Sequence, residues 1–316
     1  MLELSSTGPD QVQRKRFGRT EEWVSILGVG GYSLGLAPSL EEAIAIVNEA
    51  IDAGVNFFDN AWGYHDGKSE EWMGQALKGK RDKVFLMTKV CTYGRDKKVG
   101  LRQLDESLKR LQTDHLDLWQ IHECVYDNDP ERHFARGGVI EALDEAKKAG
   151  KVRHVGFTGH KHPAIHLKML SYNYPFDSVQ MPLNAACDAS YRSFQKLVLP
   201  EVNHRGMAGL GMKSLGGNGQ PITQGVVTVA EALRYALSLP VATTISGIDT
   251  LAVLRQNLEI ARGFQPMTAE EMETLNKRCA RAAGDGHLEL YKSTMKYDCD
   301  LGREQHGLPS HKELPL

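Results

Sequence analysis

Four residues with the chemistry of a proton-transfer site occur in order near the ends of short apolar runs. Asp59, Lys89 and His122 each lie at the end of such a run, and Tyr64 follows Asp59 by five residues. An Asp, a Lys or a His is costly to bury unless it is paired. Three of them at successive strand ends therefore indicate a functional site rather than three unrelated structural residues.

Together these residue types favour acid catalysis by the tyrosine. An ammonium next to a phenol stabilises the phenolate, so Lys89 is expected to lower the pKa of Tyr64 from its ordinary value of about 10. Asp59 is expected to hold and neutralise Lys89. Such a tyrosine donates a proton to a carbonyl oxygen while hydride arrives at the carbonyl carbon.

The elements that must position this site alternate between short apolar runs and longer amphipathic stretches. The apolar runs predict strands at residues 25–30, 55–59, 84–89, 116–121, 152–158, 178–181, 208–213 and 242–246. The amphipathic stretches predict helices at 41–53, 68–77, 101–111, 139–149, 164–170, 191–203, 229–238 and 250–261. Nearly continuous apolar strands are typical of a parallel sheet that is buried on both faces. Eight such units in about 250 residues predict a (β/α)8 TIM barrel.

The whole chain, 1–316, is expected to form one domain with the barrel at about 25–265. A short hairpin around residues 17–24 precedes the barrel and is expected to cover its floor. A C-terminal helix and tail, 266–316, follow it, with the tail from Gly284 near the barrel mouth, either as an ordered lid or partly disordered. A doubly wound sheet is the alternative fold, but the sequence at 28–31, GVGG, is only part of its GxGxxG fingerprint.

Composition argues against several other classes of protein. With 38 Lys and Arg against 40 Asp and Glu, no bulk charge favours nucleic acid or an acidic membrane. No stretch approaches the roughly 20 consecutive apolar residues that span a bilayer, and residues 1–16 lack the apolar core of a signal peptide. Five scattered cysteines without a CxxC motif indicate free thiols in a reducing compartment. We therefore expect a cytoplasmic enzyme without nucleic-acid or membrane partners.

Residues 54–64, GVNFFDNAWGY, followed by Ser69-Glu70, resemble the signature of the aldo-keto reductase family. Thr88-Lys89 and the segment 116–122, LDLWQIH, resemble its second and third blocks, and the similarity extends over about residues 13–282. The resemblance implies an NAD(P)(H)-dependent oxidoreductase that acts on an aldehyde, a ketone or a sugar. It assigns Tyr64 as the general acid, Asp59 and Lys89 as its tuning pair, and His122 as the residue that orients the substrate carbonyl.

The resemblance also implies that a nicotinamide cofactor lies across the barrel mouth, with Gln180 at the nicotinamide amide. The positions implied in cofactor binding are Thr158, Gly159, Gln180, Met212, Lys213, Ser246, Gly247, Asp249, Thr250, Gln256 and Asn257.

Some of these positions depart from the family pattern. Gly159 replaces an amide side chain, and Met212 replaces a stacking aromatic residue, although methionine still packs against a ring. Gly247 and Val253 stand where the family has a basic clasp for the 2′-phosphate, and Asp249 adds a carboxylate that suits a ribose hydroxyl better. NADP(H) is expected from the family, and NAD(H) is nearly as strongly indicated.

Two further residues are candidates for substrate binding. Trp62, between Asp59 and Tyr64, is expected to line the substrate pocket. Glu123, next to His122, is expected to bind substrate hydroxyls or to raise the pKa of His122; a surface carboxylate is the alternative.

Three other functions stay open. The motif His160-x-His162-x3-His166 permits a metal-dependent barrel hydrolase. Solvated loop and helix-start histidines explain it better, since too few ligands accompany them, so no metal is expected. A non-catalytic nicotinamide-nucleotide sensor and a redox-neutral epimerase that retains its cofactor are the other two alternatives.

Overall fold

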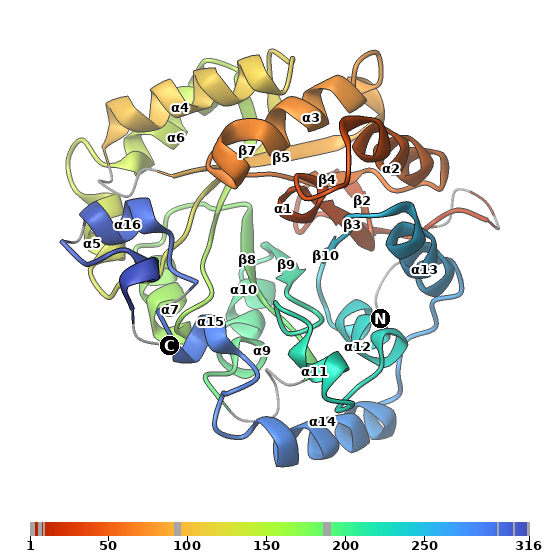
Figure 1. The fold of residues 1–316 in the computed structure, drawn as a ribbon. Coiled ribbons are helices and arrows are strands. Elements are labelled where there is room, and N and C mark those ends of the chain that lie inside the picture. Colours follow the sequence, from red (N-terminus) through yellow and green to blue (C-terminus); the bar gives the residue numbers. More distant parts are fainter. Residues whose placement is uncertain are drawn as a thin grey trace.

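The computed structural model describes residues 4–5, 8, 10–91, 96–185, 191–295, 297–305 and 307–314. Eight parallel strands form a closed barrel in chain order, and the last strand pairs with the first (Figure 1). The strands are β3 (Leu27–Gly30), β4 (Phe57–Asp59), β5 (Phe85–Val90), β6 (Leu116–Ile121), β7 (Val152–Thr158), β8 (Ser178–Pro182), β9 (Ala208–Met212) and β10 (Thr243–Gly247). The (β/α)8 TIM barrel expected from the sequence is confirmed.

Helices surround the barrel (Figure 1). The longer ones are α2 (Leu40–Asp52), α3 (Lys68–Ala76), α4 (Lys97–Arg110), α6 (Val139–Lys148), α7 (Pro163–Ser171), α12 (Val229–Ser238), α13 (Leu251–Arg262) and α14 (Ala269–Ala283). The short ones are α1 (Gly31–Leu34), η1 (Tyr64–Gly67), η2 (Arg81–Lys83), α5 (Asp129–Phe134), α9 (Phe194–Leu197), α10 (Leu199–His204), α11 (Gln220–Thr223), α15 (Leu290–Ser293), α16 (Asp300–Gln305) and η3 (His311–Glu313).

The helix expected at 191–203 is wrong in one respect, because two short helices, α9 and α10, occupy this stretch. Pro200 lies in the first turn of α10. Proline has no backbone N–H to donate and its ring clashes with the preceding turn, so it begins a helix rather than continuing one.

The hairpin before the barrel consists of β1 (Arg14–Arg16) and β2 (Trp23–Ser25), which pair antiparallel. Phe17 in its turn is fully buried, and its ring centroid lies 4.8 Å from that of Phe85. Phe57 and Phe85, the first residues of β4 and β5, belong to the same apolar cluster. The hairpin therefore closes the N-terminal end of the barrel, as the sequence predicts.

The C-terminal tail is held by buried polar contacts. Glu289 and Lys292 are almost fully buried and form an ion pair at 2.8 Å. Asn184, beyond β8, donates hydrogen bonds to the Glu289 carboxylate (3.3 Å) and the Tyr291 hydroxyl (3.1 Å). The tail therefore packs on the barrel end where β8 terminates, as the expected position near the mouth requires. Within the described part of the chain, no helix has the length and apolar character needed to cross a membrane.

Candidate active site

The buried pair of Lys89 and Asp59 lies at the centre of the mouth. β4 and β5 are parallel neighbours, so the two side chains meet at the C-terminal ends of their strands. The ammonium of Lys89 forms an ion pair with Asp59 and donates a hydrogen bond to the Asn60 carbonyl at 2.7 Å. The same nitrogen lies 3.4 Å from the hydroxyl oxygen of Tyr64. Lys89 is 1% exposed and Asp59 4%, so water screens the pair weakly.

The loop that carries Tyr64 has an unusual backbone. His65 and Asp66 both adopt positive φ angles, 51° and 56°, which few residues other than glycine tolerate. The Nε2 atom of His65 lies 2.8 Å from the carbonyl oxygen of Tyr32, and the Tyr32 ring contacts Tyr64 edge-on with 5.4 Å between centroids. These contacts fix the phenol over Lys89.

Burial, followed by the negative charge of Asp59, raises the pKa of Tyr64 well above its ordinary value. The expectation of a lowered Tyr64 pKa is therefore wrong for this structure, because burial of the phenol and the charge of Asp59 raise it. The phenol keeps its proton, as a proton donor must.

His122 faces Tyr64 from the end of β6. The two rings meet edge-on with 5.8 Å between centroids. Burial, together with the charges of Lys89 and Lys213, lowers the pKa of His122 well below its ordinary value. The imidazole is therefore neutral, and the expectation that Glu123 raises its pKa is wrong. Its Nδ1 atom lies 3.3 Å from the Cys91 thiol, which leaves Nε2 toward the mouth.

Glu123 is buried at the mouth, so the surface-carboxylate alternative is excluded. One carboxylate oxygen, Oε1, accepts a hydrogen bond from the backbone N–H of Cys299 in the tail at 3.0 Å. The other, Oε2, lies 3.4 Å from Nδ1 of His160 and 4.0 Å from Nε2 of His122. Burial, with a smaller effect of the Asp298 charge, raises the pKa of Glu123 to about 7.

The three histidines of the 160–166 motif do not converge on one point. His162 accepts a hydrogen bond from the Ala164 N–H and so caps α7. His166 is fully buried between the rings of Phe157 and Phe194. The expectation that these are solvated histidines is therefore wrong for His160 and His166, which are buried by β7 and its neighbours. Among the residues that the structure describes, no group of three potential ligands is arranged to hold a metal.

The implied nicotinamide end of the cofactor site lies where β7, β8 and β9 terminate. The side-chain oxygen Oε1 of Gln180 is buried and has no hydrogen-bond partner among the described residues, and Nε2 lies 3.7 Å from the sulfur of Met212. Thr158 is buried at the end of β7. At Gly159, a Cβ atom would lie 2.3 Å from the carbonyl oxygen of Cys124, which explains why no amide side chain stands there.

Lys213 directly follows β9, and its side chain packs against two tyrosines of the C-terminal tail. Its ammonium lies 5.2 Å from the centre of the Tyr291 ring and 6.0 Å from that of Tyr297. Burial lowers the pKa of Lys213 from its ordinary value. The structure therefore places this lysine at the covered mouth rather than on a solvated strand end.

The implied adenosine end is divided between buried and exposed positions. Asn257 donates a hydrogen bond to the Ser246 hydroxyl at 3.1 Å, and both are buried. Thr250 caps α13 by accepting from the Val253 N–H. The exposed positions are Gly247, Asp249 and Gln256.

Two contacts lie near the positions implied for binding the 2′-phosphate. A Cβ atom at Gly247 would lie 2.6 Å from the Ser33 hydroxyl, so a longer side chain there needs Ser33 to move. The guanidinium of Arg255 binds both carboxylate oxygens of Glu49, at 2.8 and 2.9 Å. The Arg255 side chain is therefore bound to α2 through Glu49.

Trp62 is held against α4. Its indole N–H donates to the Glu106 carboxylate at 2.7 Å, and the Arg110 guanidinium lies 5.5 Å from the ring centre. The polar edge of the indole thus has a protein partner, and a place in the substrate pocket stays a prediction.

Three residues near the cluster were not proposed for it from sequence, namely Tyr32, Cys91 and His160. Cys91 had a detectable signal, because it lies two residues beyond Lys89 and alternation puts both on one face of a strand. His160 was considered only as a metal ligand. Tyr32 had no signal, since its contact with Tyr64 depends on how α1 meets the loop.

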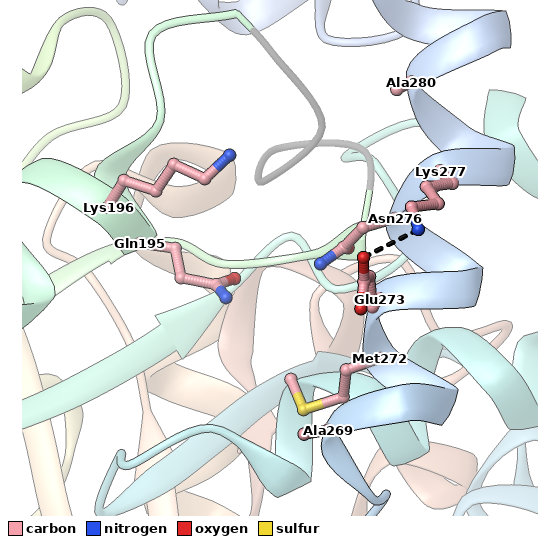
Figure 2. A pocket seen from close by; sticks show the side chains of 8 residues that line it. All are labelled: Gln195, Lys196, Ala269, Met272, Glu273, Asn276, Lys277 and Ala280. Carbon is pink, nitrogen blue, oxygen red and sulfur yellow. Dashed lines mark ion pairs between the residues drawn. The ribbon is translucent and has the colours of Figure 1, made fainter.

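A separate surface hollow of about 490 Å³ lies between α9 and α14, away from this cluster (Figure 2). Gln195 and Lys196 line one side, and Met272, Glu273 and Lys277 line the other. Glu273 and Lys277 pair with each other at 2.6 Å. None of the candidate residues faces this hollow.

Fold and site together define a (β/α)8-barrel protein whose buried polar cluster lies at the C-terminal mouth. The chain belongs to the aldo/keto reductase family, whose sequence profile matches residues 26–219. It is therefore an oxidoreductase of the NAD(P)H-dependent kind.

Individual relatives agree with this assignment. The uncharacterized oxidoreductase YqkF of Bacillus subtilis is 25% identical over 302 residues, which cover 84% of this chain and 95% of that protein. Other curated relatives are matched over about half of their length. The holo form of aldo-keto reductase AKR11C1 from Bacillus halodurans has a TM-score of 0.71 at 24% identity, covering 88% of this chain and all of that one. An aldo/keto reductase from Klebsiella pneumoniae in complex with NADP and acetate has a TM-score of 0.69 at 23% identity, covering 86% and 95%.

Proposed function

We propose that this protein reduces the carbonyl group of a small aldehyde, ketone or sugar with a nicotinamide cofactor, and that Tyr64 is the general acid. The observation that carries the proposal is the position of the Lys89 ammonium, which links the Asp59 carboxylate to the Tyr64 hydroxyl. A phenol that is protonated and lies beside a fixed cation can release its proton, because the cation stabilises the phenolate that forms.

The cofactor site is supported by a polar atom that lacks a partner. The buried Oε1 of Gln180 needs a donor, and within the described part of the chain its amide nitrogen contacts the weak acceptor sulfur of Met212. A carboxamide offers a donor and an acceptor in complementary positions, so Gln180 fits the amide of a nicotinamide, with Thr158 beside it. When bound, the cofactor supplies the hydride. The nicotinamide end of the site is compatible with both NAD(H) and NADP(H), because the two differ only at the adenosine end.

Residues of the protein position the carbonyl group and transfer the proton. Neutral His122 directs Nε2 toward the mouth, where it orients a carbonyl oxygen beside the Tyr64 hydroxyl. Tyr64 donates its proton to that oxygen, and Lys89 stabilises the phenolate. Asp59 keeps the ammonium in place. The tail covers this end of the barrel and reduces access of water, which strengthens each of these charge interactions.

The direct test is transfer of isotope from a defined position. The purified protein is incubated with propanal and with NADH or NADPH in which both hydrogens at nicotinamide C4 are replaced by deuterium. We expect deuterium on the carbinol carbon of the product alcohol, which mass spectrometry detects. If neither nucleotide binds at millimolar concentration, or if the alcohol forms without the label, the proposal is wrong.

A further inference from the structure

The wall between β6 and β7 is polar where it borders the carbonyl site. Glu123 lies two residues after β6 and His160 two residues after β7, and the two side chains contact each other at 3.4 Å. Both are buried, with 6% of Glu123 and 4% of His160 exposed. Burying a carboxylate and an imidazole is unfavourable unless their polar atoms are paired.

We propose that Glu123 and His160 form a hydroxyl-binding pair that selects carbonyl substrates with a hydroxyl on the carbon next to the carbonyl. This rests on the proposed carbonyl reduction. It adds a substrate class, 2-hydroxy aldehydes and 2-hydroxy ketones, and assigns the residues that recognise it.

The first step of the argument is the unequal use of the two Glu123 oxygens. Oε1 is fixed by the backbone N–H of Cys299, which comes from the tail. Oε2 faces the two imidazoles, 3.4 Å from His160 and 4.0 Å from His122. The carboxylate is thus held on one side by the protein and presents its second oxygen beside the residue that orients the carbonyl.

The second step is the partner that His160 lacks. Burial, followed by the charges of Lys213 and Lys161, lowers the pKa of His160 well below its ordinary value, so the ring is neutral. Nδ1 of this ring faces Glu123 at 3.4 Å, and a neutral imidazole with its hydrogen on Nδ1 keeps Nε2 as an acceptor. This Nε2 is buried and has no hydrogen-bond partner among the described residues. A donor is therefore needed at this position.

The third step is the chemistry of that donor. A hydroxyl group donates to Oε2 of Glu123 or to Nε2 of His160, whereas a methyl group leaves both acceptors unpaired. Since Oε2 lies 4.0 Å from the His122 nitrogen, the carbonyl and hydroxyl that bind them belong on neighbouring carbons. An unsatisfied buried acceptor costs roughly 1–3 kcal/mol. We therefore expect discrimination of about 10- to 100-fold for the hydroxylated substrate.

The test compares 2-hydroxypropanal with propanal, which differ by one hydroxyl. The wild-type protein is expected to show a kcat/KM ratio of about 10 to 100 in favour of 2-hydroxypropanal. His160→Phe and Glu123→Gln are each expected to reduce this ratio at least about five-fold, because the loss of kcat/KM is larger for 2-hydroxypropanal than for propanal. His204→Phe and Glu131→Gln replace exposed residues of the same types on α10 and α5, and are expected to leave the ratio unchanged.

The outcomes separate this inference from the proposed function. Turnover of both aldehydes without a preference, or a preference that survives in both variants, overturns the hydroxyl-binding pair alone. Equal losses on both aldehydes assign the pair a structural role and also overturn it. Failure of the wild-type protein to reduce either aldehyde contradicts the proposed function, and with it this inference. If His160→Phe does not fold, Glu123→Gln, which keeps an acceptor for Cys299, decides the result.

Discussion

The side-chain nitrogen of Lys89 lies between two oxygens, the carboxylate of Asp59, with which it forms an ion pair, and the hydroxyl of Tyr64 at 3.4 Å. The ion pair offsets the cost of burying the ammonium, and the second contact directs its charge at the phenol. Because burial raises the pKa of Tyr64, the phenol is a weak acid until negative charge develops on a substrate oxygen. The lysine then matters most in the transition state, where proton transfer is under way.

Tyr64→Phe removes the proton donor and keeps the ring. We expect kcat to fall by about 10²- to 10⁴-fold, the usual contribution of general acid catalysis, with cofactor affinity nearly unchanged. Stopped-flow turnover and fluorescence titration of the cofactor measure the two quantities. Tyr172→Phe, at an exposed tyrosine after α7, is the matched control. Retention of more than about half of the activity would exclude Tyr64 as the acid.

Lys89→Met is expected to impair both activity and stability. Removing one partner of a buried ion pair leaves the other charge unpaired and costs about 3–5 kcal/mol, less whatever Asp59 recovers by taking up a proton. The double variant Lys89→Met/Asp59→Asn has no unpaired charge, so we expect it to be more stable than Lys89→Met alone. Urea unfolding at pH 7 compares both variants with Asp59→Asn and with the wild type. A double variant whose loss equals the sum of the single losses would mean that the pair is not coupled.

Much of this architecture could be predicted because the strands are continuous apolar runs. β6 and β7 begin and end where the sequence places them, at 116–121 and 152–158. Asp59, Lys89 and His122 could be grouped because parallel strands bring their C-terminal ends together. The contact between Glu123 and Cys299 could not be predicted from the sequence, because it joins residues 176 positions apart and Cys299 lies in a tail without periodicity. The direction of the Tyr64 pKa shift could not be predicted either, because the sequence does not show how deeply the phenol is buried.

Cys91 is expected to act as a positioning residue for His122. A thiol that donates to Nδ1 leaves the hydrogen of the neutral ring on Nε2, which faces the mouth. Cys91→Val removes this donor, and we expect kcat/KM to fall about five-fold, equivalent to about 1 kcal/mol. Cys91→Ser retains a donor and should recover most of the loss. The ¹⁵N chemical shifts of the His122 ring report the tautomer, and an unchanged tautomer in Cys91→Val would contradict this role.

His166 makes stability depend on pH. Burial lowers its pKa from 6.5 to about 4, so between these values the unfolded chain binds a proton that the folded protein does not. The free energy of unfolding should therefore fall as pH decreases from 6.5 to about 4, by at most roughly 3 kcal/mol from this group. Urea unfolding at pH 7.5, 6 and 5 measures the slope. His166→Gln should reduce this slope, whereas His204→Phe, at an exposed position, should not; His122 and His160, whose pKa values burial also lowers, account for the slope that is left. Equal slopes in the wild type and His166→Gln would show that another group dominates.

Cofactor preference is the final prediction. With Gly247 at a basic position of the family and Arg255 bound to Glu49 by two hydrogen bonds, a 2′-phosphate gains no bidentate partner from either residue. Asp249 is exposed, and the resemblance assigns it to this end of the site, where its charge is expected to repel a phosphate at short range. We expect NADPH to bind at most about 10-fold more tightly than NADH, a difference of about 1.4 kcal/mol. Dissociation constants from tryptophan fluorescence at low and moderate salt give the ratio. Asp249→Asn should move it toward NADPH, and Glu259→Gln, an exposed carboxylate on α13, should not. A preference for NADPH above about 100-fold would mean that another basic group binds the phosphate, with Lys213 the first to replace.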